Sequence, residues 1–327
     1  MQTRKRQLLG LAAGTLAIPR WAQAQTAGRH YRIGWFNISD TAKEPYAVAF
    51  VQRLAELGFV VGRNLTIERR HANNVLERVP AVAAELGKLK CDAYFGGGSE
   101  ATLTGLTQAN PHTPIIFIAV DFDPVATGDV ASLARPGGRV TGVTAIQSEL
   151  PAKRLEMLKE MLPSITRVAV LANEQTAAQV ALVQGTARRI GLALQVVDLK
   201  RPPFDFPAAF AEIARGKADA LFVTGSGLWV PSRRLIPELA LKARLPTMFH
   251  QAQWTEAGGL ISYGFNFVSM WRRGAEMVAS LLRGTKPENI PMEQPTVFEL
   301  AINMKTAKAL GIKVPKTLLV RAERIIE

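Results

Sequence analysis

The sequence has few cysteines, few histidines and no long apolar run, and each shortage excludes a class of protein. Cys91 is the single cysteine, so no disulfide can form within the chain. His30, His71, His112 and His250 lie far apart in the sequence, and none has the spacing of a metal site such as HExxH. No Gly-x-Ser-x-Gly nucleophile motif is present either. These shortages argue against a metalloenzyme or a serine hydrolase, and no cofactor is expected.

The first 24 residues carry the features of an export signal. Residues 4–6 are Arg-Lys-Arg, residues 8–18 are uncharged and mostly apolar, and residues 22–24 have the small-x-small pattern that signal peptidase recognises. The apolar run of 11 residues is too short to span a bilayer, because a membrane-spanning helix needs about 20. We therefore expect cleavage after Ala24 and a mature periplasmic protein. The pattern does not decide between Sec and twin-arginine export.

The chain has a formal net charge of +13. Such an excess is compatible with nucleic-acid binding. Here the basic residues are scattered, and no run beyond the export signal is longer than Arg69-Arg70-His71. This distribution is typical of a solvated basic surface, so we expect no nucleic-acid partner.

After the export signal, apolar runs alternate with helical patterns, which is typical of a mostly parallel sheet covered by helices. Two such sets begin with similar strands, at residues 31–36 and 167–172. The sequence therefore predicts an α/β protein with two similar Rossmann-like lobes, joined by ordered crossovers. Strands are predicted at 31–36, 65–69, 91–95, 115–119, 167–172, 194–199, 220–224, 247–249 and 259–263. Helices are predicted at 45–57, 76–89, 99–109, 150–162, 176–190, 206–214, 232–243 and 267–282.

Short polar residues follow most of the predicted strands. Ligands of open α/β sheets bind beyond the carboxyl ends of the strands, so these residues are candidates for a ligand site. The candidate ligand-binding residues are Ser39, Asp40, Gly97, Gly98, Ser99, Asp121, Asn173, Gly225, Ser226, Gln251 and Tyr263. Turns between strands and helices favour the same residue types for capping and for positive φ, and this is the alternative for any one position.

Residues 96–101, Gly-Gly-Gly-Ser-Glu-Ala, match the dinucleotide-binding pattern G-x-G-x-x-A. The pattern follows the third predicted strand instead of the first, and nicotinamide cofactors are scarce outside the cytosol. The same turn exposes backbone amides at a helix start, and such amides bind any small anion, a carboxylate included. We expect the amides of Gly97 and Gly98 and the hydroxyl of Ser99 to hold an anionic group of a ligand. A plain tight turn is the alternative.

Asp121 ends an apolar strand at the mouth of the expected cleft. A buried carboxylate needs a partner, because burying an unpaired charge is costly. A ligand ammonium at Asp121 and a ligand carboxylate at Ser99 would together describe an amino acid or a related zwitterion. The alternative is that Asp121 caps the following turn. Aromatic residues that would favour an aromatic ligand are Phe122, Trp229 and Tyr263.

Several segments carry a family resemblance. They include 132–142 (Ser-Leu-Ala-Arg-Pro-Gly-Gly-Arg-Val-Thr-Gly), 153–159, 256–264, 293–296 and 302–311. On these segments the chain is similar, over residues 31–327, to the substrate-binding proteins of ABC transporters with the type I periplasmic-binding fold. Some members of that family take up aromatic amino acids such as tryptophan.

The resemblance implies a lobe of residues 29–145 plus 266–292, a second lobe of 146–263 plus 293–327, and a hinge of three crossovers. One segment departs from the family pattern. Residues 120–124 are Val-Asp-Phe-Asp-Pro, where relatives usually carry Gly-Asp-Pro. The ligand specificity of another member therefore cannot be transferred to this chain.

The resemblance also implies a function. It describes a monomeric periplasmic solute-binding protein, not an enzyme, that captures a small polar ligand between its lobes. The ligand would be an amino acid or a related zwitterion, delivered to an ABC permease in the inner membrane. Two alternatives stay open: a ligand-sensing partner of a membrane receptor, and an exported enzyme that uses the loop 96–98.

Overall fold

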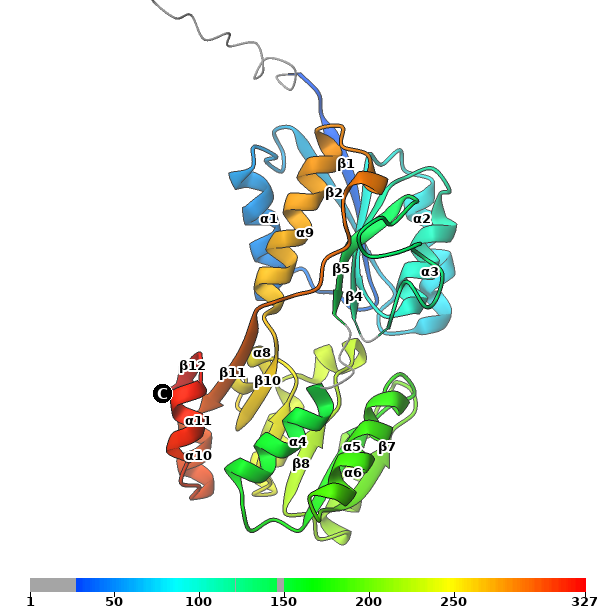
Figure 1. Ribbon diagram of the computed structural model, residues 1–327. Helices are drawn as coiled ribbons and strands as arrows, with labels where there is room; N and C mark the ends of the chain where they lie inside the picture. The colour runs from blue at the N-terminus through cyan, green and yellow to red at the C-terminus, as the bar shows by residue number, and fades with distance from the viewer. Residues whose placement is uncertain (1–27, 121, 146–149) are drawn as a thin grey trace, which may run out of the picture.

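Two α/β lobes make up the computed structural model, which describes residues 28–120, 122–145 and 150–327 (Figure 1). The upper lobe in Figure 1, which we call the N-lobe, is built on a sheet of five strands. The lower lobe, the C-lobe, is built on a sheet of seven strands.

The elements have the following bounds. The N-lobe strands are β1 (Tyr31–Asn37), β2 (Leu65–His71), β3 (Ala93–Gly98), β4 (Ile115–Val120) and β5 (Val140–Ala145). The C-lobe strands are β6 (Arg167–Ala172), β7 (Ala193–Asp198), β8 (Ala220–Val223), β9 (Thr247–Phe249), β10 (Ile261–Phe265), β11 (Phe298–Asn303) and β12 (Arg324–Ile326). The α-helices are α1 (Pro45–Glu56), α2 (Val79–Gly87), α3 (Glu100–Ala109), α4 (Leu150–Met161), α5 (Ala177–Arg189), α6 (Phe206–Arg215), α7 (Leu235–Lys242), α8 (Ala252–Glu256), α9 (Phe267–Leu282), α10 (Met304–Leu310) and α11 (Lys316–Arg321). The 3₁₀ turns are η2 (Leu76–Arg78), η3 (Gly227–Ser232) and η4 (Pro287–Asn289).

Both sheets are dominated by parallel pairs. The strand order is β2-β1-β3-β4-β5 in the N-lobe and β12-β11-β10-β9-β8-β6-β7 in the C-lobe. Among the named strands, β10 and β11 form the antiparallel pair. Helices α1 and α9 pack on one face of the N-lobe sheet, and α2 and α3 pack on the other (Figure 1). Parallel sheets need this cover on both faces, because their strands are apolar on both sides.

Local sequence explains where several helices begin. Pro45 opens α1, where its fixed φ suits the first helical position and its missing N–H is not needed. The carboxylate of Asp205 accepts a hydrogen bond from the amide of Ala208 at 2.9 Å and caps α6. Asn266 caps α9 in the same way through the amide of Ser269, also at 2.9 Å. Such caps satisfy backbone N–H groups that have no partner within the helix.

Helix α9 follows a C-lobe strand in the chain but packs on the N-lobe sheet. Its Trp271 lies 5.1 Å from the ring of Phe95 on β3, which in turn stacks on Phe50 of α1 at 3.9 Å. Gly274 lets the sheet approach closely, because a Cβ there would lie 2.9 Å from the ring of Phe95. The position of α9 therefore depends on aromatic packing against residues far earlier in the sequence.

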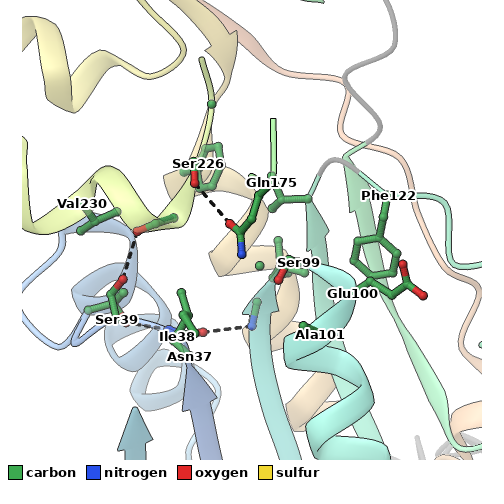
Figure 2. A pocket seen from close by; sticks show the side chains of 18 of the residues that line it. Asn37, Ile38, Ser39, Ser99, Glu100, Ala101, Phe122, Gln175, Ser226 and Val230 are labelled. Carbon is green, nitrogen blue, oxygen red and sulfur yellow. Dashed lines mark hydrogen bonds between the residues drawn. The ribbon is translucent and has the colours of Figure 1, made fainter. Parts of the chain in front are cut away.

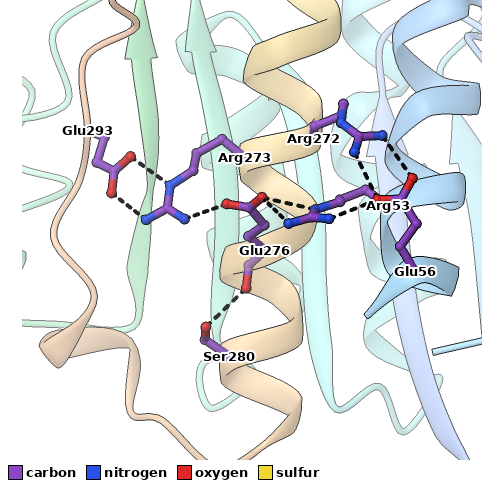
Figure 3. A network of polar contacts seen from close by, with 7 residues as sticks. All are labelled: Arg53, Glu56, Arg272, Arg273, Glu276, Ser280 and Glu293. Carbon is purple, nitrogen blue, oxygen red and sulfur yellow. Dashed lines mark hydrogen bonds and ion pairs between the residues drawn. The ribbon is translucent and has the colours of Figure 1, made fainter. Parts of the chain in front are cut away.

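A network of arginine and glutamate side chains connects α9 with α1 and with the segment that leads to β11 (Figure 3). Arg53 of α1 donates to Glu276 of α9 at 2.9 Å, and Arg272 of α9 donates to Glu56 of α1 at 2.8 Å. Arg273 continues the network with bonds of 2.6 Å to Glu276 and to Glu293, which lies on the segment that leads to β11. The network joins three segments that are distant in the sequence.

The chain passes between the lobes three times. It leaves the N-lobe between β5 and α4, returns between β10 and α9, and leaves again between η4 and β11. Residues 146–149 of the first passage lie outside the described residues. On the third passage the segment runs beside β5, where the amide of Thr144 donates to the carbonyl of Glu293 at 2.8 Å.

The structure differs from the sequence-based predictions in several places. The strand expected at 91–95 is β3, which extends to Gly98 because Gly96–Gly98 continue the ladder with β4. The helix expected at 76–89 is divided into η2 and α2. The helix expected at 232–243 starts later, because Pro231 lies within the 3₁₀ turn η3. Strand β5, helix α8 and all elements after α9 were not predicted.

Candidate functional site

A cavity of about 480 Å³ lies between the lobes, at the carboxyl ends of their strands (Figure 2). This volume is within the range of small-molecule sites. Seven of the candidate residues line it: Ser39, Gly97, Gly98, Ser99, Gly225, Ser226 and Gln251. Asp121 lies outside the described residues, so its expected role stays a prediction.

On the N-lobe side, Asn37 at the end of β1 organises the polar wall. Its amide nitrogen donates to the hydroxyl of Thr41 at 2.6 Å, and its amide oxygen accepts a hydrogen bond from the backbone N–H of Gly97 at 3.0 Å. The Gly97 amide is therefore already used within the protein. This contradicts the expectation that it binds a ligand anion, although Gly97 itself lines the cavity.

The start of α3 presents the remaining amides of this wall. Ser99 has the extended backbone of a helix N-cap, but its side chain makes no capping hydrogen bond. The first-turn amides therefore lack the side-chain partner that capping usually provides. Glu100 and Ala101 line the cavity beside Ser99. Among the described lining residues there is no lysine or arginine, so a ligand anion would be held there by backbone amides and neutral side chains.

On the C-lobe side, two turns form the polar wall. The hydroxyl of Ser226 donates to the side-chain oxygen of Gln175 at 3.2 Å and accepts from the amide of Leu228 at 3.2 Å. The side chain of Gln179 binds both the N–H and the C=O of Gly225, each at 2.8 Å. The polar backbone groups of Gly225 are thus engaged within the lobe, and this residue offers a ligand only the space left by its missing side chain.

The apolar part of the cavity is a wall of aromatic rings from α1 and α9. The ring of Tyr46 lies 4.6 Å from Trp271 and 5.9 Å from Phe267. Burial, and then the neighbouring Glu44 carboxylate, raises the pKa of Tyr46, so its phenol stays neutral. Trp271 is 4% exposed, and its indole nitrogen has no hydrogen-bond partner among the described residues. Flat rings in this arrangement suit an apolar or aromatic group of a ligand.

His250 lines the cavity at the end of β9 and is buried. Burial, followed by the nearby positive charge of Arg154, lowers the pKa of His250 to about 3. The imidazole is therefore neutral at physiological pH. A neutral imidazole can donate one hydrogen bond and accept another, so His250 adds polarity to the cavity without adding charge.

Three candidate residues do not line the cavity, for reasons that the contacts make clear. Asp40 is exposed, and its carboxylate accepts from the amide of Ala42 at 3.0 Å within its own loop. The side-chain oxygen of Asn173 is bound by the amide of Gln175 at 3.0 Å, so Asn173 shapes the turn after β6. It lines a smaller hollow within the C-lobe instead.

The third is Tyr263, whose ring stacks on Phe298 of the neighbouring strand β11 at 6.1 Å. Among the suggested aromatic residues, Phe122 lines the cavity. Trp229 does not, because its fully buried ring packs 4.7 Å from Phe204 in the C-lobe core.

Direct contacts join the lobes around the cavity. The Ser39 hydroxyl lies 3.1 Å from the carbonyl oxygen of Gly227 across the gap and 2.6 Å from the side-chain oxygen of Asn74. Glu44 of the N-lobe forms an ion pair with Arg233 of the C-lobe. These contacts hold the lobes in a closed arrangement. Ser39 therefore serves the lobe contact as well as the cavity wall.

Two lobes of this topology with a ligand-sized cavity between them are typical of proteins that bind a small molecule between their lobes. The chain matches the family described as ABC transporter substrate binding protein over residues 38–326, and it belongs to that family. It is 25% identical over 267 residues, 81% of this chain and 76% of the relative, to the tyrosine-binding protein of Clostridioides difficile (strain R20291).

Solved structures share the fold. The ABC domain in complex with L-Trp from Streptococcus pneumonia has a TM-score of 0.79 at 21% identity, over 91% of this chain and 100% of that chain. A conserved domain protein from Vibrio cholerae has a TM-score of 0.80 at 24% identity, over the same shares.

These comparisons confirm the predicted fold class, the family and the non-enzymatic binding role. Proteins of this family are typically extracellular or periplasmic. Within the ranges that the structure describes, no helix is long and apolar enough to cross a bilayer.

Proposed function

We propose that the protein is the periplasmic solute-binding component of an ABC importer for an aromatic amino acid or a closely related zwitterion. The observation that carries the proposal is the composition of the cavity between the lobes. Uncapped amides at the start of α3 lie on one side, an aromatic wall lies on another, and the described lining contains no lysine or arginine. The relatives named as tyrosine-binding or bound to L-Trp support the same ligand class.

In this proposal each part of the ligand has a partner. The carboxylate lies at the start of α3, where backbone amides and the helix dipole favour negative charge. The aromatic ring packs against Tyr46, Phe267 and Trp271. The ammonium group faces acidic side chains, for which Glu100 and Glu174 in the lining and the predicted Asp121 are the candidates. The protein captures the ligand and does not transform it.

Capture follows from closure. A ligand that contacts both lobes binds the closed form more tightly than the open one, and that difference in affinity shifts the population towards the closed form. The closed form would then be recognised by a permease in the inner membrane. We propose that the protein acts as a monomer, since each chain provides both walls of the cavity.

We also propose a cleavage site for the export signal and boundaries for the two lobes. Export would end with cleavage after Ala24. The proposed lobes are residues 29–145 plus 266–292 and residues 146–263 plus 293–327. Packing of α9 on α1 supports the first assignment, and pairing of β11 with β10 supports the second.

Calorimetry on residues 25–327 tests the proposal. The protein is unfolded and refolded beforehand so that any co-purified ligand is removed. L-Tryptophan, L-tyrosine and L-phenylalanine are titrated in parallel with tryptamine and indole-3-propionate, which lack the carboxylate and the ammonium respectively. We expect micromolar binding of at least one amino acid, about −8 kcal/mol, and much weaker binding of the two analogues. Equal binding of the analogues, or no binding of any amino acid, would overturn the proposed ligand class.

A further inference from the structure

The side chain of Gln175 is held in one orientation by its neighbours in the C-lobe. Ser226 accepts a hydrogen bond from the amide of Leu228, which leaves its own hydroxyl hydrogen to donate. That hydrogen goes to the side-chain oxygen of Gln175 at 3.2 Å. The oxygen of the carboxamide is fixed in this way, and its nitrogen has no hydrogen-bond partner among the described residues, so both hydrogens of that nitrogen remain for another acceptor.

The nitrogen of Gln175 is directed into the cavity. Figure 2 shows it pointing away from Ser226, towards the side where Ser99 and Ala101 begin α3. Gln175 belongs to the C-lobe, whereas α3 belongs to the N-lobe. Donors from both lobes therefore line the same cavity.

A third donor lies beside the same turn. A Cβ on Gly97 would lie 3.6 Å from Cζ2 of Trp271, so the indole edge that carries the N–H is next to the end of β3. Trp271 is buried, and its N–H has no partner among the described residues. A buried donor without a partner is costly, so its presence here points to a ligand atom that accepts a hydrogen bond.

We propose that Gln175 is the specificity-determining residue of the C-lobe, whose side-chain nitrogen donates to the ligand carboxylate held at the start of α3. Ser226 is the positioning residue that orients it. The inference rests on the proposed function, because it requires a ligand with a carboxylate. In this arrangement the ligand carboxylate contacts both lobes, so that binding of the carboxylate itself favours closure of the lobes.

The decisive variant is Gln175→Glu, which keeps the shape and replaces the donor by a negative charge. Removing a hydrogen bond to a charged group typically weakens binding about 10- to 150-fold, and like-charge repulsion adds to this. For L-tryptophan we expect a loss on the order of 100-fold or more. L-Tryptophanamide, in which an uncharged amide replaces the carboxylate, should lose much less. Gln184→Glu on the exposed surface of α5 is the matched control and should bind L-tryptophan as the wild type does.

A double-mutant cycle tests the role of Ser226. Ser226→Ala should weaken L-tryptophan binding in the wild-type background and have little further effect when Gln175 is already alanine. Purely additive effects would show that Ser226 acts independently of Gln175. Thermal melts of each variant confirm folding. If Gln175→Glu melts far below Gln184→Glu, Gln175→Met takes its place in the binding experiment.

The outcomes separate the two proposals. If the refolded wild type binds no carboxylate ligand, the proposed function fails and this inference fails with it. If the wild type binds L-tryptophan and Gln175→Glu binds it equally well, the inference alone is overturned. An equal loss of L-tryptophan and L-tryptophanamide in Gln175→Glu also overturns it, because the carboxylate would not be what Gln175 recognises.

Discussion

Replacing Glu44 by glutamine should open the protein and weaken its affinity for ligand. Glu44 immediately precedes α1, and its carboxylate pairs with Arg233 of the opposite lobe. The side chains are 11% and 26% exposed, so the pair is neither fully buried nor fully hydrated. Exposed pairs contribute about 0.2–1 kcal/mol, whereas removing one partner of a buried pair costs 3–5 kcal/mol. We therefore expect Glu44→Gln to cost about 1–3 kcal/mol.

The pair spans the two lobes, so most of this cost falls on the closed form. The fraction of protein in the binding-competent closed form therefore falls. If the whole cost of about 1–3 kcal/mol falls on that form, the apparent Kd rises about 5- to 150-fold. Calorimetry measures the Kd, and small-angle X-ray scattering measures the radius of gyration of the ligand-free protein. The variant should be more extended than the wild type before ligand is added, and it should approach the wild-type dimensions when ligand is saturating.

A matched control separates this effect from a general loss of charge. Glu85→Gln removes an exposed carboxylate that pairs with Arg70 inside the N-lobe, and it should change neither quantity. Adding Arg233→Met to Glu44→Gln should cost little more than Glu44→Gln alone, because the pair is already broken. An unchanged Kd and an unchanged radius of gyration for Glu44→Gln would refute the reasoning.

Three further predictions concern stability. Gly142→Ala should destabilise the N-lobe by about 3 kcal/mol or more in chemical unfolding, because its φ is +146° and a Cβ would lie 2.0 Å from the carbonyl oxygen of Phe117. Gly185→Ala, in open space on α5, should instead add about 0.5–1 kcal/mol, and a loss there would contradict the argument. Burial alone would raise the pKa of Glu276, but hydrogen bonds from Arg273 and Arg53 outweigh it and lower the pKa below 4.5. The ionised Glu276 carboxylate therefore contributes to the free energy of unfolding above pH 4.5, and this contribution is lost as the pH falls further. In Glu276→Gln the free energy of unfolding should depend less steeply on pH in that range. The pKa of His250 falls from 6.5 to about 3, chiefly through burial. The contribution of the neutral imidazole to the free energy of unfolding is complete above pH 6.5 and is lost as the pH falls towards 3. In His250→Gln the free energy of unfolding should therefore depend less on pH between these two values.

Elements with strong periodicity could be predicted from the sequence. The helix expected at 267–282 is α9, and the strand expected at 167–172 is β6. Strand β5 was missed because Gly142 and three short polar or small residues weaken its pattern, and its pairing with β4 becomes visible only in the sheet. The antiparallel return of β11 likewise depends on pairing with β10.

The rule that ligands bind at strand ends found much of the polar cavity wall. It included Asn173 because short polar residues shape turns as readily as they bind ligands, and here the side chain shapes its own turn. The same rule indicates the whole polar turn 173–175, but the candidate list kept only Asn173 from it, because the orientation of Gln175 depends on a distant serine. It also missed Phe267 and Trp271, because α9 reaches the cavity from a strand of the opposite lobe. Contacts between distant segments are not encoded in local patterns.

A crystal structure of the mature chain with L-tryptophan tests the central claim most directly. The ligand should lie between the lobes, with its carboxylate within hydrogen-bond distance of the first-turn amides of α3 and of the side-chain nitrogen of Gln175. Its ring should contact Tyr46 or Trp271. A ligand bound outside this cavity, or one whose carboxylate faces away from α3, would contradict the account.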